Sequence, residues 1–206
     1  MILIPAKAPK WTQNYHFGWI GFVHHHSRLA EAIAWMTRWW RGPKQPFVSH
    51  VFIVSSQNTC LEAINAGVKE TNLAQYFNHP RCTVYLRQPR GWTFQQGAAI
   101  VKEAAKYRDY DYDFALLGAD AISYSIIGKI LNDLCGDALD NLLTRIADDP
   151  RKMICDKLAV LAMQSRPELR SIGTLALPAR ENNPQRLFAD DAIFEPHVTE
   201  LKGSIA

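Results

Sequence analysis

The sequence predicts an α+β domain in which an antiparallel β-sheet packs against helices, and three observations lead to this prediction. Several short segments are rich in β-branched and aromatic residues, as strands are. Other segments repeat apolar residues at helical spacing. The chain runs strand, helix, several strands and then helices, which is the order of an α+β domain with an antiparallel sheet.

The individual elements can be assigned from these patterns in chain order. The strand patterns occupy residues 17–23, 47–55, 59–64, 68–70 and 82–87. The helical patterns occupy residues 28–40, a short segment ending at residue 77, residues 93–107, residues 120–148, a segment that begins near residue 154, and a last turn at 184–188. Both faces of the strand at 47–55 are rich in apolar residues, so we expect it in the interior of its sheet.

Length and composition indicate one globular domain. The chain has 206 residues, of which 48% are hydrophobic and 21% charged, enough for a substantial core. We expect a single domain over residues 1–206, with its core at about 17–165 and a tail, rich in prolines and charges, at about 167–206. Arg87 and Arg90 are expected on solvated faces.

Charge and cysteine content restrict the functional classes. The formal net charge of +3 permits an anionic partner without requiring one. Neither a basic stripe with interleaved aromatics nor a glycine-rich phosphate loop is present, so we expect no nucleic-acid partner and no cofactor. The four cysteines form no CxxC pair, which argues against a zinc knuckle.

The start of the chain and its hydropathy bear on location. Residues 1–7 lack the basic region and long apolar run of a secretory signal, and no stretch approaches the roughly 18 apolar residues of a membrane span. We therefore expect a protein that is cytoplasmic or is delivered without a Sec signal. We expect no membrane span, and this expectation is compatible with peripheral contact with lipid. The oligomeric state is left open.

Cys155 is the most informative single residue. It follows the breaker Asp149-Pro150, and the apolar positions 154, 158, 161 and 162 place it in the first turn of a buried helix. Free N–H groups and partial positive charge at a helix start stabilise a thiolate, which is the nucleophilic form of cysteine. The alternative is a small apolar residue that merely packs the helix.

His50 and Glu62 provide the partners that a nucleophilic cysteine needs. Side chains on neighbouring antiparallel strands lie about 5 Å apart, so Glu62 can accept a hydrogen bond from one nitrogen of His50 while the other nitrogen faces the sulfur. This is the nucleophile, base and orienting group of a cysteine hydrolase. Alternatively, His50 is a core histidine bonded to the backbone, and Glu62 a solvated carboxylate at a strand edge.

Eight segments occur in the order found in one known family. They are GWIGF at 18–22, LAEAI at 29–33, SHVFIV at 49–54, LEA at 61–63, GV at 67–68, VYLR at 84–87, YDYDF at 110–114 and ICDKL at 154–158. On these motifs the chain resembles the circularly permuted papain-like hydrolases of the NlpC-type superfamily, in particular the YiiX/YebB-like branch. The resemblance covers residues 17 to about 165, and it implies a bacterial or phage origin.

The resemblance implies roles for four residues. Cys155 would be the nucleophile, His50 the general base and Glu62 the orienting residue, while Tyr112 would lie near the site and help to hold the oxyanion beside the Cys155 N–H. The family usually has Ser-Glu after its cysteine, whereas this chain has Asp156-Lys157. Asp156 adds a negative charge beside the sulfur, which works against the thiolate unless its side chain points to solvent or caps the helix.

The expected activity is hydrolysis of an amide, either a cell-wall peptide or a γ-glutamyl-like or isopeptide bond. Two alternatives stay open: acyl transfer or hydrolysis of a lipid ester or thioester by the same fold, and a binding module that has lost the chemistry, which Asp156 favours.

The triplet at residues 24–26, three consecutive histidines, invites a metal site. Adjacent residues on an extended segment point to alternate faces, whereas two histidines on one ion normally need another spacing, such as i and i+4 on a helix. We expect no metal, and a place near the mouth of the site for this segment.

Overall fold

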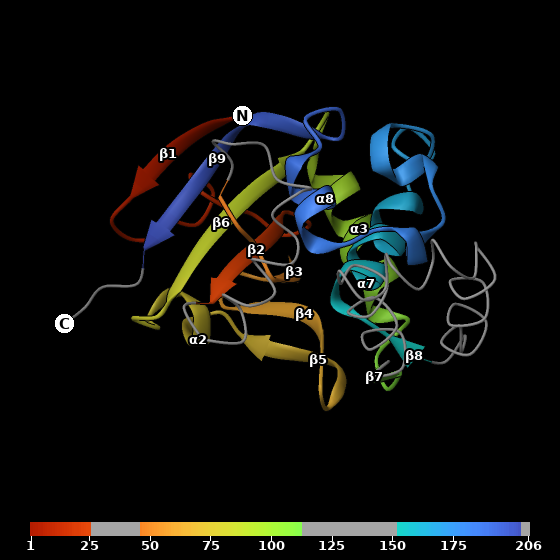
Figure 1. Cartoon of the computed structure of the whole chain (residues 1–206), viewed down its shortest axis with the longest axis horizontal. Coiled ribbons are helices and arrows are strands. Elements are labelled where there is room, and N and C mark those ends of the chain that lie inside the picture. Colours follow the sequence, from red (N-terminus) through yellow and green to blue (C-terminus); the bar gives the residue numbers. More distant parts are fainter. Residues whose placement is uncertain (26–45, 113–151, 203–206) are drawn as a thin grey trace, which may run out of the picture.

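A computed structural model describes residues 1–25, 46–112 and 152–202 (Figure 1). Its main feature is a seven-stranded sheet with the order β1-β9-β6-β2-β3-β4-β5. The strands are β1 (Ile2–Ala6), β2 (Ile20–His25), β3 (His50–Val54), β4 (Thr59–Ile64), β5 (Gly67–Asn72), β6 (Cys82–Pro89) and β9 (Phe194–Lys202). The helices are α2 (Ala74–Phe77), α3 (Phe94–Ala105), α7 (Cys155–Gln164) and α8 (Pro184–Ala189), with 3-10 turns at Gly173–Ala176 and Ala179–Glu181.

The sheet is mixed rather than wholly antiparallel. Five of its neighbouring pairs, from β9·β6 through β4·β5, are antiparallel, and the four among β6, β2, β3, β4 and β5 join strands that the sequence predicted. The sixth pair, β1 with β9, is parallel, because the unpredicted strand β1 adds to the edge beside β9 in the same direction. The prediction of an antiparallel sheet was therefore wrong at this edge. A separate parallel pair joins β7 (Asp111–Tyr112) to β8 (Lys152–Met153).

The central strands confirm the sequence patterns most closely. β3 lies between β2 and β4 and buries Val51, Phe52, Ile53 and Val54, as expected for the apolar run at 47–55. α3 also matches its prediction, since the Thr93 side chain caps it by accepting a hydrogen bond from the Gln96 N–H. The helices predicted at 28–40 and 120–148 lie outside the described residues.

Two hydrophobic cores cover the two faces of the sheet. The larger one joins the inner sides of α3, α7 and α8 to the sheet through Ile53, Leu61 and Ile100. The smaller one packs Phe52, Leu73 and Tyr76 on the opposite side, where α2 lies. Figure 1 shows α3, α7 and α8 grouped at the right and α2 apart from them, at the lower left near β4 and β5. Among the helices within the described ranges, none combines the length and apolar character that crossing a membrane takes.

The last part of the chain belongs to the core. We expected a tail after residue 167, but Leu187, Phe188, Ile193 and Phe194 are fully buried, and β9 fills a place inside the sheet between β1 and β6. The prolines and charges in this region lie in and around short elements separated by turns. They interrupt the apolar pattern, so the sequence did not indicate that these residues are buried. The core therefore extends well beyond residue 165.

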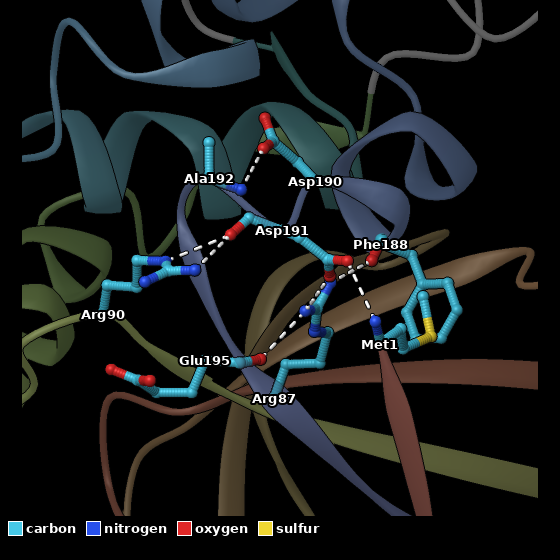
Figure 2. A network of polar contacts seen from close by, with 8 residues as sticks. All are labelled: Met1, Arg87, Arg90, Phe188, Asp190, Asp191, Ala192 and Glu195. Carbon is cyan, nitrogen blue, oxygen red and sulfur yellow. Dashed lines mark hydrogen bonds and ion pairs between the residues drawn. The ribbon is translucent and has the colours of Figure 1, made fainter.

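Arg87 holds this last segment to the sheet from a fully buried position (Figure 2). Its guanidinium donates to the backbone carbonyl oxygens of Phe188 and Glu195 and to the Asp191 carboxylate, and it lies 4.8 Å from the centre of the Phe194 ring. The expectation that Arg87 lies on a solvated face was wrong. The alternation of β6 points it inward, where three acceptors compensate for the lost water.

Candidate active site

Cys155 is the first residue of α7, as the sequence predicted. The strand β8 leads directly into it, and Ile154 takes the extended N-cap position but has no side-chain oxygen with which to cap the helix. The backbone N–H groups of the first turn therefore point toward the end of the helix where Cys155 lies, and the Ile154 side chain does not cap them. Cys155 is 8% exposed, so its sulfur sits in a mostly buried position beneath the surface.

His50 is the first residue of β3, opposite Val23 of β2. Its side chain is 19% exposed, and its Nε2 lies 2.6 Å from Oε2 of Glu62. The pairing of Ile53 with Leu61 sets the register of β3 and β4. Continued along the strands, this register places His50 and Glu62 diagonally across the ladder, on the same face and within reach of each other.

Glu62 is fully buried and surrounded by donors. Oε2 accepts from His50 and from the Tyr76 hydroxyl, while Oε1 accepts from the Thr71 hydroxyl and from the Gln75 amide at 2.8 Å. The alternative of a solvated carboxylate at a strand edge is therefore wrong. Four donors satisfy a buried carboxylate almost completely, which is the condition for keeping such a charge out of water.

Thr71, Gln75 and Tyr76 were missed by the sequence analysis. They lie at the end of β5 and in α2, the segment that the sequence treated only as a short helix with a cap. The available signal was the polar character of this segment. Thr71 lies near the end of β5, and Gln75 and Tyr76 follow in α2. The β4–β5 hairpin folds this segment back beside Glu62.

The charges of this group reinforce one another. Burial alone would raise the pKa of Glu62, but hydrogen bonds from His50, Thr71 and Tyr76 and the positive charge of His50 together lower it, so that the carboxylate is ionised. Burial likewise lowers the pKa of His50. The charge and hydrogen bond of the Cys155 sulfur, followed by those of Glu62, outweigh burial and raise the pKa of His50 to about 10.

The three predicted residues are therefore brought together. Glu62 occupies Nε2 of His50, and the Cys155 sulfur lies close enough to the ring to raise its pKa through its charge and a side-chain hydrogen bond. These side-chain partners replace the alternative in which His50 is a core histidine bonded only to the backbone. A carboxylate, an imidazole and a sulfur at a helix start form the order that nucleophilic catalysis by cysteine uses.

Asp156 and Tyr112 lie beside this group. Asp156 is 2% exposed in the first turn of α7, so it does not point to solvent, and it lies where the helix dipole favours a carboxylate. Tyr112 pairs with Met153, two residues before Cys155, which places its backbone near the helix start. Its side chain is partly buried against the larger core.

His24 and His25, the two residues of the histidine triplet that the structure describes, are neighbours on β2. His24 pairs with Thr83 and His25 with Cys82, so the two follow one another along β2, and His26 lies outside the described residues. The His25 Nε2 lies 3.3 Å from the Cys82 sulfur. Over residues 1–25, 46–112 and 152–202, no set of three or more His, Cys, Asp or Glu side chains is arranged to hold a metal ion.

Comparison with known proteins adds no relative to this geometry. No protein-family model matches the chain, and no curated protein or solved structure is significantly similar to it. The function of the protein must therefore be inferred from its fold and from the arrangement of side chains around Cys155.

Proposed function

We propose that this protein is a cysteine hydrolase of permuted papain-like architecture that cleaves amide bonds, with a cell-wall peptide or an isopeptide-like bond as its substrate. The observation that carries the proposal is the linked series in which Glu62 holds His50, and His50 faces the Cys155 sulfur at the start of α7. The resemblance of the sequence motifs to the permuted hydrolases supports the same reaction.

The proposed reaction passes through an acyl enzyme. At neutral pH His50 already holds the proton that the thiol gives up. The Cys155 sulfur bonds to the carbonyl carbon, and as the C=O π bond opens its oxygen gains the negative charge. The Cys155 backbone N–H donates to that oxygen, and Tyr112 helps to stabilise it. As the C–N bond breaks, His50 gives its proton to the leaving amine. Water then attacks the thioester and passes a proton to His50, the C–S bond breaks to release the acid, and the sulfur and the protonated His50 return to their starting state.

The buried charge of Glu62 argues for chemistry over a binding module. A desolvated carboxylate is costly to bury, and apolar residues of similar volume stabilise a fold as well or better. A module that had only to bind would gain no stability from keeping Glu62 ionised inside the sheet. The cost is accounted for if Glu62 holds His50 in a reactive position.

The test is a substrate panel assayed with the wild type and with Cys155→Ser. Peptidoglycan fragments and isopeptide-linked peptides are followed by release of a new amine, and phospholipids and acyl thioesters by loss of an acyl chain. We expect amine release from the wild type and none from Cys155→Ser. Acyl loss alone would instead favour the lipid hydrolase or acyltransferase, and no turnover of either class together with an unreactive thiol would favour the binding module.

A further inference from the structure

Tyr76 contacts the proposed catalytic group from outside it. It is buried in α2, and its ring stacks on Phe52 with centroids 5.2 Å apart and planes inclined by 11°. The Phe52 ring in turn lies across Gly21 of β2, where any side chain larger than hydrogen would collide with it. Three neighbouring elements thus fix the plane of the Tyr76 ring.

The fixed ring directs its hydroxyl at one atom. That hydroxyl donates to Oε2 of Glu62, the same oxygen that faces His50, while Thr71 and Gln75 donate to Oε1. The carboxylate is therefore held at both oxygens from the β5–α2 side. Burial and the nearby Glu62 charge raise the pKa of Tyr76, which keeps its hydroxyl protonated and a donor.

We propose that Tyr76 is a positioning residue, which orients the Glu62 carboxylate so that His50 presents Nδ1 to the Cys155 sulfur. This inference rests on the proposed function and adds a residue to it. Without the hydroxyl, Oε2 keeps only the imidazole as a donor, and Thr71 and Gln75 hold the carboxylate through Oε1 alone. The position of Oε2, the acceptor that sets which imidazole nitrogen faces the sulfur, is then less firmly fixed.

The experiment compares Tyr76→Phe with Tyr15→Phe. Both variants keep the ring and remove one hydroxyl from a buried tyrosine, but the Tyr15 hydroxyl donates to the backbone oxygen of Gln57 at 2.7 Å, away from Glu62. Two readouts are used: the ¹⁵N resonances of the His50 ring, assigned by their loss in His50→Ala, and the rate at which iodoacetamide alkylates Cys155, followed by mass spectrometry of its peptide.

We expect Tyr76→Phe to shift both His50 nitrogen resonances and to slow alkylation of Cys155 by about tenfold, as loss of a supporting residue commonly does, while Tyr15→Phe changes neither. Unchanged His50 resonances in Tyr76→Phe would overturn the positioning role. A wild-type Cys155 that reacts no faster than free cysteine would overturn the proposed function instead, and the His50 resonances would still decide the role of Tyr76.

Discussion

The Nε2 atom of His50 and the Oε2 atom of Glu62 lie 2.6 Å apart, between the first residue of β3 and the middle of β4. This contact fixes which nitrogen of the ring is used by the carboxylate and which is left for Cys155. Since the two residues come from strands paired in the sheet, their spacing is set by the sheet and not by a loop. Substitutions at the site and in the surrounding sheet therefore have separable effects on thiol reactivity and on stability.

Glu62→Gln should slow the alkylation of Cys155 near neutral pH by about tenfold or more, in the range that supporting residues contribute. The amide keeps the shape of the side chain but loses the charge that favours the protonated ring. The rate is measured with iodoacetamide and mass spectrometry of the Cys155 peptide. Glu70→Gln is the matched control, because Glu70 is an ionised carboxylate on the neighbouring strand that binds Ser55, Thr59 and Arg108 instead. Equal rates in both variants would contradict the role of Glu62.

His50 should keep its proton through neutral pH and titrate near 10 in an NMR titration of its ring. The Cys155 sulfur is the largest of the contributions that raise this pKa, so Cys155→Ser should move the midpoint downward. A midpoint near 6.5 in the wild type, unchanged in Cys155→Ser, would show that the ring interacts with neither partner.

The same shift makes stability depend on pH. A raised pKa in the folded state means that the His50 contribution is complete below about pH 6.5 and is lost as the pH rises through about 10. We expect the free energy of unfolding in urea to fall over this window more steeply for the wild type than for Glu62→Gln. Parallel curves of unfolding free energy against pH for the two proteins would contradict the link between the raised pKa of His50 and stability.

Gly18→Ala should destabilise the fold by at least about 3 kcal/mol, from left-handed backbone strain and overpacking together. Gly18 has φ of +75°, and a Cβ atom there would lie 2.4 Å from the Cα of Gly97 in α3. Gly91→Ala is the control, since Gly91 also has positive φ but nothing lies within 4 Å of its Cβ position. Urea unfolding measures both variants, and equal losses would show that the contact with α3 does not matter.

Arg87→Leu should destabilise the protein by about 3 kcal/mol or more, because the buried carbonyl oxygen of Phe188 and the partly buried one of Glu195 lose their donor. Arg90 is exposed and its guanidinium donates to the backbone oxygen of Asp191, so Arg90→Leu should cost less than about 1 kcal/mol. Thermal and urea unfolding distinguish the two. A small loss in Arg87→Leu would mean that the last segment docks without its buried cation.

Local patterns were sufficient to predict the interior of the sheet. The apolar residues on both faces of β3 and the helical spacing after Cys155 correctly predicted a buried strand and a buried helix that starts at the cysteine. Short turns between β3 and β4 and between β4 and β5 likewise favour antiparallel pairing of these strands.

Long-range placement could not be predicted in the same way. β1 and β9 pair across almost the whole chain, and nothing in the local pattern of Ile2–Ala6 indicates a parallel partner near the other end. The burial of Arg87 is of the same kind, since its acceptors Phe188, Asp191 and Glu195 lie about a hundred residues away. In the site, the sequence did not predict that Tyr76 contacts Glu62. This contact depends on the stacking of Tyr76 on Phe52, which sequence spacing does not reveal.

The central claim is that His50 activates Cys155, and the rate of Cys155 alkylation as a function of pH tests it most directly. We predict that the wild type reacts at pH 7 about ten times faster than a free cysteine, of which only a few per cent is thiolate at that pH, and that His50→Ala loses this advantage. A wild-type rate equal to that of free cysteine, unchanged in His50→Ala, would contradict the claim.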